Sequence, residues 1–599
     1  MPNNDLHTFH IPVMGLGFTI DTPLKVARYG ISSVISIIED ELIEKMRKHH
    51  SEQWDLPFTP IDSNSLDSHA TRITAYLDMI DSIVAIQFKQ LKMLPFEEGN
   101  ELSKYFELLP DTSSLKKVYV EMALLENGAE KERMENWLKE NMATGSIDVN
   151  IMSKVDKMNY SKSGEQLPSE FSDALSSLRG FANSSLQSSV VFSAGYNPRL
   201  YAYIENFPDF FPDENGKIKK KIILKVSDYR SALVQSKLLA KRGVWVSEFR
   251  IESGLNCGGH AFATDGLLLG PILEEFKVKR NDIVSEVFTI CNNALMAKGL
   301  PIFQHVPEIK ITVQGGIGTY NENYFLMEHY GVNATGWGSP FLLVPEATNV
   351  DDNTLNALVN AEPEDYYLSH ASPLGVPFNN FRKSSSEKQR MLRMEKGRPG
   401  SPCYKKFLSF DTEFSEKPIC TASREYQFKK IEQLKTKNLP EGVYTEAYND
   451  IIEKDCLCEG LGVAALIKEG VPVDNKLEAV VICPGPNLAY FSNIFSLQDM
   501  VDHIYGRKNI LNSINRSNMF VNELNLYVEY LKKELFRNVQ TISDKQEKLF
   551  HTFKNNLLEG IAYYRNILPQ IKFDTNECFL LMKSELDLFE NRIQRTLLA

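Results

Sequence analysis

Short apolar stretches alternate with helical patterns along much of the first 350 residues, and this alternation constrains the fold more than any other feature. Parallel strands are joined by helical crossovers, because a tight turn can connect only antiparallel strands. The strand patterns cover residues 11–15, 33–37, 147–151, 189–193, 221–226, 244–246, 309–313 and 334–337. Eight such strands predict an α/β fold, the (β/α)8 or TIM barrel. An open, doubly wound sheet is the alternative, since it requires no fixed strand count.

Glycine-rich turns follow three of these patterns. They read SGLNCGGH at 253–260, QGGIG at 314–318 and GWGS at 336–339. At the carboxyl end of a parallel strand, backbone amides with no side chain in the way suit a phosphate group. His260 stands beside the first turn, and histidine is the usual group for proton transfer near neutral pH. The turns therefore indicate a phosphorylated ligand, whereas tight turns without a ligand are the alternative.

Composition and periodicity divide the chain into four parts. Residues 1–49 and 146–350 carry the strand patterns and form the predicted barrel. Residues 50–145 are charged, leucine-rich and helical in period, which is typical of an insertion. Residues 351–495 form an accessory region with weak periodicity that holds five of the eight cysteines, and residues 496–599 are helical again. The insertion and the C-terminal helices could pack on the barrel, act as a lid or form an oligomer interface.

Bulk properties favour a soluble globular protein of the cytoplasm. The 599 residues are 43% hydrophobic and 24% charged, which is ordinary for globular proteins, and the net charge is −12. Without a long basic run, a nucleic-acid partner is not expected. Without a long apolar stretch or a basic N-terminal leader, neither a membrane span nor secretion is expected. Disulfides are therefore not expected either.

The cysteines of the accessory region indicate a metal site. Thiolates prefer soft metals, and both closely spaced cysteines and cysteine before proline recur at iron–sulfur ligands. An iron–sulfur cluster is the first expectation and zinc the second, while ordinary buried thiols are the alternative. Four of the five would be ligands, with Cys420 the last choice. The candidates are Cys403, Cys420, Cys456, Cys458 and Cys483.

The turns also match, in order, the elements of a known enzyme family. The family's glutamate-alanine-glycine-glycine-histidine signature appears as residues 256–260, and its alanine-glycine-glycine-isoleucine turn as residues 314–317. Its methionine-glycine-threonine-arginine-phenylalanine element appears as residues 337–341, and its glycine-valine-asparagine-leucine strand as residues 148–151. Its opening proline strand and threonine-proline helix appear as residues 12–14 and 22–24. Residues 11–50 and 145–350 thus resemble the nitronate monooxygenases, whose superfamily includes flavin-dependent enoyl-acyl-carrier-protein reductases.

This resemblance implies an FMN site at the carboxyl end of the barrel. It makes His260 the candidate acid or base. The residues that would lie at the cofactor are Met14, Gly15, Asn150, Gly258, Gly259, Gln314, Gly315, Gly316, Gly336, Gly338 and Ser339. The chain departs from the family at Asn256 and Cys257, which replace glutamate and alanine, and at Pro340, which replaces arginine.

Three classes of function follow from these expectations. The first is an FMN-dependent oxidoreductase of the nitronate monooxygenase type, acting on a small molecule. The second is a flavin-dependent enoyl-thioester reductase, which would need an electron donor and could receive electrons through an iron–sulfur cluster. The third is a barrel that only binds, either a protein partner or a phosphorylated metabolite without flavin.

Overall fold

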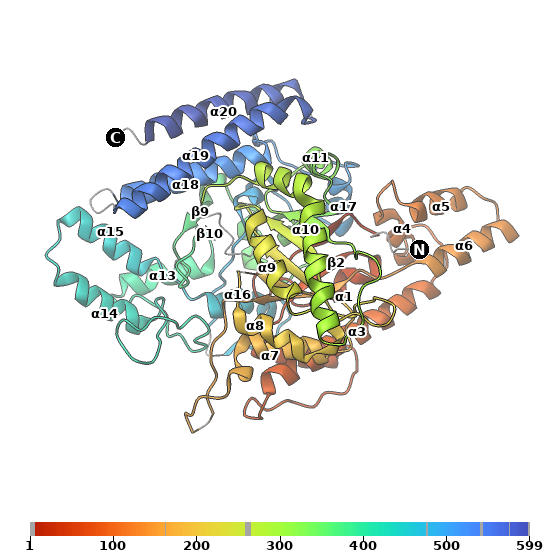
Figure 1. Cartoon of the computed structure of the whole chain (residues 1–599), viewed down its shortest axis with the longest axis horizontal. Helices are drawn as coiled ribbons and strands as arrows, with labels where there is room; N and C mark the ends of the chain where they lie inside the picture. Colours follow the sequence, from red (N-terminus) through yellow and green to blue (C-terminus); the bar gives the residue numbers. More distant parts are fainter. Residues whose placement is uncertain are drawn as a thin grey trace.

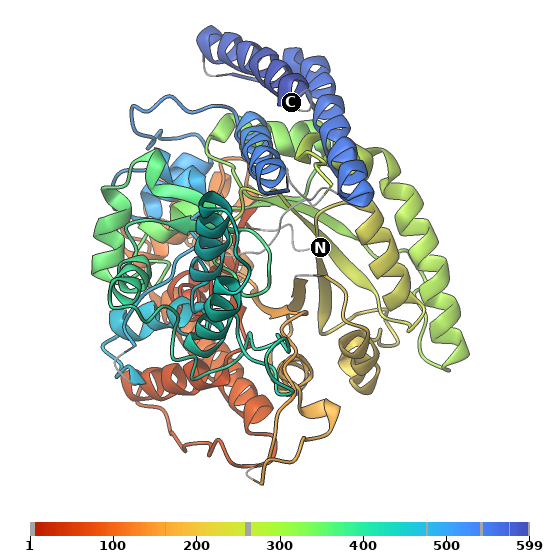
Figure 2. The ribbon, with the colours of Figure 1, turned by 90° about the vertical axis from the view of Figure 1, so that its left-hand side faces the viewer.

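Eight parallel strands in the described chain close into a barrel, with the strands in chain order and β8 paired with β1. The computed structural model describes residues 6–161, 163–193, 195–257, 265–474, 477–538, 543–573 and 575–596. The predicted (β/α)8 barrel is therefore confirmed (Figure 2). The strands are β1 (Phe9–Ile11), β2 (Ser32–Ser36), β3 (Ile147–Met152), β4 (Ser189–Ser193), β5 (Lys221–Val226), β6 (Val246–Glu252), β7 (Lys310–Gln314) and β8 (Ala334–Gly336).

The sixth strand lies later in the chain than the pattern 244–246 predicts. It alternates apolar Phe249 and Ile251 with charged Glu248, Arg250 and Glu252. The apolar residues face the helices, since the Phe249 ring lies 5.9 Å from that of Phe276 on the outer helix that follows β6. The charged residues therefore face the barrel interior. A barrel interior is usually apolar, and for that reason the sequence pattern places this strand too early.

Helices surround the barrel, and part of the insertion joins this ring. The helices that follow the strands are α1 (Thr22–Val26), α2 (Asp40–Gln53), α7 (Asp173–Asn183), α8 (Pro198–Tyr203), α9 (Tyr229–Ala240), α10 (Leu269–Ala297) and α11 (Tyr320–Tyr330). The insertion comprises α3 (Ser68–Met93), α4 (Glu101–Leu108), α5 (Ser114–Ala123) and α6 (Ala129–Asn141). A Cβ on Gly180 of α7 would lie 2.7 Å from Cβ of Ile73, so α3 packs closely against the ring.

The accessory region contains more regular structure than its weak periodicity predicts. It comprises α12 (Asp352–Val359), β9 (Tyr366–Ser369), β10 (Phe378–Phe381), α13 (Ser385–Glu395), α14 (Arg424–Lys435), α15 (Glu441–Ile452) and α16 (Leu457–Lys468). The β1 loop attaches it to the barrel, because the amides of Leu16 and Gly17 donate hydrogen bonds to the Leu461 carbonyl at 3.2 and 2.9 Å.

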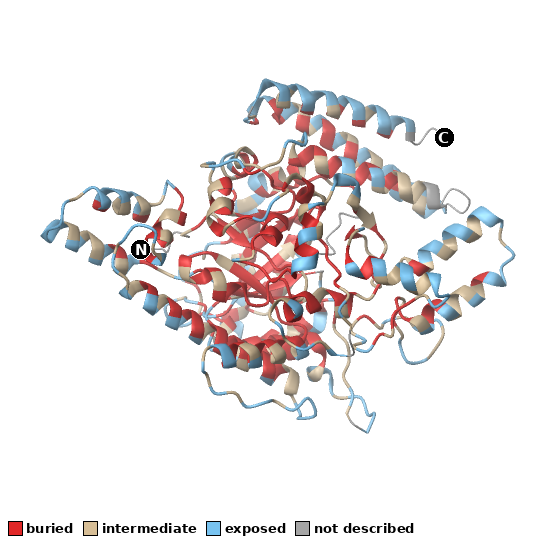
Figure 3. Ribbon diagram, turned by 180° about the vertical axis from the view of Figure 1, so that it is seen from behind, coloured by how far each residue is buried: buried red, intermediate tan, exposed pale blue. Residues whose placement is uncertain are grey.

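The C-terminal region is helical, as predicted. Its helices are α17 (Leu497–Ile504), α18 (Met519–Asn538), α19 (Asp544–Ile567) and α20 (Asn576–Thr596). The last three lie together along one side of the molecule, at the top of Figure 1. Buried residues concentrate in the barrel and its ring, whereas α14, α15 and α20 carry many exposed residues (Figure 3). No helix in the described ranges combines the length and the apolar character that a bilayer crossing requires.

Candidate functional site

The barrel interior holds charged side chains that satisfy one another at two levels. At the lower level, Arg250 Nε donates to Glu248 Oε1 at 2.8 Å, and the Thr312 hydroxyl donates to the same oxygen at 2.6 Å. Burial opposes ionisation of Glu248, but the Arg250 guanidinium outweighs it and holds the pKa of that carboxyl below its usual value. A buried charge persists only when it is paired in this way.

The upper level lies at the carboxyl ends of the strands and centres on Glu252. Its Oε1 lies 2.7 Å from Lys225 Nζ, and the pair is almost completely buried. The same oxygen accepts hydrogen bonds from Gln314 Nε2, at 2.8 Å, and from Asn256 Nδ2 of the side chain. His10 Nε2 lies 3.4 Å from the Gln314 side-chain oxygen. Burial, aided by the Arg250 charge, lowers the pKa of His10 to about 3, so His10 is neutral at physiological pH.

Two consecutive residues with positive φ form the turn that follows β7. Gly315 has φ +104° and Gly316 has φ +79°, a conformation that favours glycine. Close packing against neighbouring residues of the chain also requires glycine at these two positions. A Cβ at Gly315 would lie 3.0 Å from the Asn256 amide nitrogen, and one at Gly316 would lie 2.6 Å from Leu255 Cδ1. The glycines alone therefore do not establish a ligand.

The amides of this turn give a stronger indication. No described residue accepts a hydrogen bond from the amides of Gly315, Gly316 or Ile317, although all three residues are buried. Buried backbone donors are almost always paired, so three unpaired ones in succession suit an anionic ligand.

A buried ion pair between Glu322 and Arg516 contacts the same turn. The Gly318 amide donates to Glu322 Oε2 at 2.8 Å, and Arg516 Nη1 lies 2.7 Å from Glu322 Oε1. Arg516 also donates to the Gly316 carbonyl at 2.7 Å and, through Nε, to Asn487 Oδ1 at 3.0 Å. The Gly318 amide is thus used internally, whereas the three amides before it are not.

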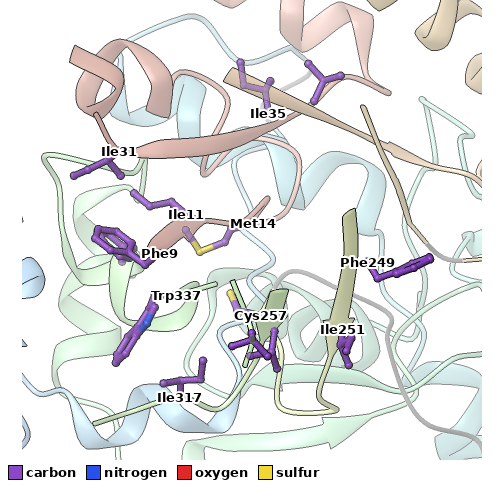
Figure 4. Close-up of a cluster of buried hydrophobic side chains, with 14 of the residues drawn as sticks. Phe9, Ile11, Met14, Ile31, Ile35, Phe249, Ile251, Cys257, Ile317 and Trp337 are labelled. Carbon is purple, nitrogen blue, oxygen red and sulfur yellow. The ribbon is translucent and has the colours of Figure 1, made fainter. Parts of the chain in front are cut away.

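The end of β8 lies against the loops that follow β1 and β6. A Cβ at Gly338 would lie 3.3 Å from Cβ of Cys257 and 3.7 Å from the Met14 sulfur. Figure 4 shows Met14, Cys257 and Trp337 in this cluster. The Cys257 thiol donates to the Cys483 carbonyl, at 3.0 Å, so the accessory region contacts the site here.

Ser339 begins the short helix η5 (Ser339–Leu343) beside the same contact. A Cβ at Gly485 would lie 3.0 Å from its hydroxyl oxygen, so the accessory region also covers Ser339. Gly336, the last residue of β8, packs against Gln314 and His10.

Two other predicted cofactor residues have different surroundings. Asn150 lies on β3 at a buried position, and its side-chain oxygen has no hydrogen-bond partner among the described residues. Gly15 instead faces Phe18 and the Leu461 carbonyl of α16. Gly258, Gly259 and His260 lie outside the described residues, and the sequence prediction for them is untested.

The C-terminal helices hold both ends of the loop between β6 and α10. Buried Glu523 of α18 accepts a hydrogen bond from the Ser253 hydroxyl at 2.7 Å and a longer one from the Gly254 amide at 3.4 Å. Its second oxygen accepts from the Leu269 amide at 2.7 Å. Burial raises the pKa of Glu523 to about 7. Aromatic rings pack on the loop's glycines, since a Cβ at Gly254 would lie 2.6 Å from Tyr527.

Several of these residues are absent from the sequence prediction. The Glu-Phe-Arg-Ile-Glu alternation at 248–252 could have identified the charged interior, because it is a strand period with one polar face. Arg516 and Glu523 carry no such signal. Their partners Glu322 and Ser253 lie 194 and 270 residues earlier in the chain.

The five candidate metal ligands lie in one region of the structure. Cys403, Cys420, Cys458 and Cys483 belong to one buried cluster, and Cys456 packs against it. The Cys483 carbonyl also accepts a hydrogen bond from the Cys257 thiol at the barrel mouth. All are free thiols. As the side chains stand, no three histidine, cysteine, aspartate or glutamate residues in the described part of the chain are arranged to hold a metal ion.

Comparisons with known proteins add little to this picture. No family model matches the chain, and no curated protein matches it. Among solved structures, the enoyl reductase domain of MlnA from Bacillus amyloliquefaciens matches with a TM-score of 0.32 and 12% identity, covering 72% of this chain and 88% of that one. Nitroalkane oxidase from Streptomyces ansochromogenes matches with a TM-score of 0.32 and 9% identity, covering 83% and 94%. Scores this low carry no conclusion about activity.

Proposed function

We propose that this chain is a flavin-dependent oxidoreductase whose cofactor binds at the carboxyl end of the barrel. The observation that carries the proposal is the run of unpaired buried amides at Gly315, Gly316 and Ile317. A phosphate group accepts several amide hydrogen bonds at once, and barrel enzymes commonly bind phosphate at the turns after their seventh and eighth strands.

The neighbouring residues fit a flavin in their chemistry. The amide of Gly338 and the amide and hydroxyl of Ser339, at the end of β8, would complete the phosphate site. The unpaired oxygen of Asn150 would accept a hydrogen bond from a ring N–H. The cation of Lys225, fixed by Glu252, supplies positive charge at the same end of the barrel. A bound flavin supplies hydride or single-electron transfer.

The proton-transfer residue that we propose is His260. Neutral His10 is unsuited to this task, because its lowered pKa leaves it without a proton to donate near neutral pH. Within the oxidoreductases we propose nitronate oxidation as the reaction, with enoyl-thioester reduction as the second candidate. Both reactions need a proton moved beside an electron-withdrawing group, which a histidine can do.

Cofactor analysis tests the proposal directly. The full chain is purified without oxygen, its visible spectrum is recorded, and the flavin released on denaturation is identified as FMN or FAD. We expect stoichiometric flavin, reduced occupancy in Asn150→Ala, and full occupancy in Asn141→Ala, a matched change on an exposed residue of α6. A folded protein that neither carries nor takes up flavin would contradict the proposal and favour a barrel that only binds.

Activity assays then separate the two reactions. Oxygen uptake with an alkyl nitronate supports nitronate oxidation. Oxidation of a nicotinamide nucleotide in the presence of an enoyl thioester supports the reductase instead.

A further inference from the structure

A buried cluster of the accessory region contains Cys403, Cys420, Cys458 and Cys483, and Cys456 packs against it. Four of these thiols face one another, whereas Cys483 faces Cys257. Cys403 and Cys420 contact each other through their sulfurs, and Cys458 lies near Cys420, Cys403 and Cys456. Three of the four are less than a tenth exposed, and Cys456 is partly buried. Free cysteines are often buried singly as small apolar residues, so four together need another explanation.

Backbone amides face each of these sulfurs. The amide of Lys406 faces Cys403, that of Ala422 faces Cys420, and that of Glu459 faces Cys456. The Cys458 sulfur faces two amides, those of Phe407 and Leu408. Amide donors stabilise a thiolate and tune a thiolate-bound metal, whereas an apolar thiol gains little from them.

The loop that carries Cys403 has a strained backbone. Cys403 and Lys406 have φ values of +56° and +58°, which side-chain-bearing residues rarely adopt. Each such residue costs on the order of 1 kcal/mol or more, and such strain concentrates at functional sites. The loop is also fixed to the barrel, because buried Lys405 lies 2.7 Å from Glu39, which follows β2.

Charged side chains and a cavity border the cluster. The cations of Lys406 and Arg393 act on Cys403 and Cys456, respectively, whereas the Asp455 carboxylate acts on Cys456 in the opposite sense. A cavity of about 940 Å³ between α14 and α15 borders Cys403 and Cys420, which gives an ion a route to the sulfurs.

We propose that Cys403, Cys420, Cys456 and Cys458 form a four-thiolate metal centre, of the zinc or iron–sulfur class, at the barrel mouth. Metal binding would draw the sulfurs together by rotation about their Cα–Cβ bonds and release their protons. The cluster packs against Leu16, Ile38 and Met152, which follow or end β1, β2 and β3. The centre would thus lie on the face of the barrel where the proposed flavin binds, but its existence does not depend on a flavin.

Metal analysis of the full chain, purified without oxygen, tests this centre. We expect stoichiometric zinc, or iron together with acid-labile sulfide and a broad visible absorbance. Either result supports the centre and identifies its class. The double variant Cys456→Ser/Cys458→Ser should lose the metal, whereas the control Cys291→Ser/Cys578→Ser should keep it. Absence of stoichiometric metal, both before and after reconstitution with Zn²⁺ or with Fe²⁺ and sulfide, would overturn the proposal.

A second measurement needs no variant, in case the double variant does not fold. The native protein is alkylated with and without prior chelator treatment, and mass spectrometry maps the modified cysteines. Protection of these four thiols that the chelator removes supports the centre. Equal alkylation in both samples overturns it. Flavin is quantified on the same sample, so failure of the metal centre and failure of the flavin proposal can be told apart.

Discussion

Glu523 offers the sharpest test of how the C-terminal helices hold the site. The residue is only 2% exposed, and burial raises the pKa of its carboxyl from 4.5 to about 7. Between these values the folded protein holds a proton that the unfolded chain releases. The free energy of unfolding therefore falls as pH rises from about 4.5 to about 7, and a difference of roughly 2.5 pKa units corresponds to about 3 kcal/mol.

The variant Glu523→Gln removes this titration and keeps the size of the side chain. We expect the stability of wild type relative to the variant to decrease by about 3 kcal/mol between pH 4.5 and 7.5. The amide also places an N–H₂ group among three hydrogen-bond donors, which costs about 1–3 kcal/mol at every pH. That cost lowers the free energy of unfolding of the variant equally at every pH, so the difference in pH dependence between wild type and variant is unaffected.

Urea unfolding at constant ionic strength, followed by the fluorescence of the barrel's buried tryptophans Trp245 and Trp337, measures the effect. Glu529→Gln, an exposed position on the same helix, is the control and should retain the wild-type pH dependence. If wild type and Glu523→Gln differ by the same amount at every pH, burial does not control this carboxyl and the reasoning is wrong.

Two further predictions concern contacts of the C-terminal region. Arg516→Met leaves the Glu322 carboxylate buried and unpaired, and should lower the free energy of unfolding by about 3–5 kcal/mol. The double variant Arg516→Met/Glu322→Gln should recover most of this loss in thermal unfolding. No recovery would contradict the pairing of Arg516 with Glu322. Gly270→Ala places a Cβ 2.4 Å from the Tyr564 ring and should cost about 1–3 kcal/mol and make α19 more sensitive to limited proteolysis. Gly128→Ala, which meets no atom within 4 Å, is the control, and equal proteolysis of the two variants would refute the close approach.

Local patterns in the sequence were sufficient for most of the barrel. The pattern at 221–226 coincides with β5, because its Lys-Ile-Ile-Leu-Lys-Val run is apolar on both faces at its centre and has a lysine near each end. The pattern at 244–246 misplaces β6, because the charged residues that β6 directs into the barrel interior interrupt the apolar pattern expected of a buried strand.

Contacts between residues far apart in the chain could not be predicted from the sequence. Nothing near Arg516 indicates that it contacts the turn after β7, and nothing near Glu523 indicates that it holds the loop after β6. Which cysteines lie next to one another could not be predicted from the sequence either. The sequence makes Cys420 the last choice of the five, whereas the fold sets Cys420 beside Cys403 and brings Cys483 to Cys257 as well. Sequence separation gives no information about such neighbours.

The contact between Ser253 and Glu523 has a consequence for synthesis of the chain. The two residues are 270 positions apart, and ribosomes add about 5–20 residues each second. Ser253, which directly follows β6, therefore emerges on the order of 15 to 50 seconds before the carboxylate that fixes the β6 loop. During that interval the nascent barrel exposes the surface that α18 and α19 later cover. A chaperone that shields this surface would be expected to improve the yield of folded protein.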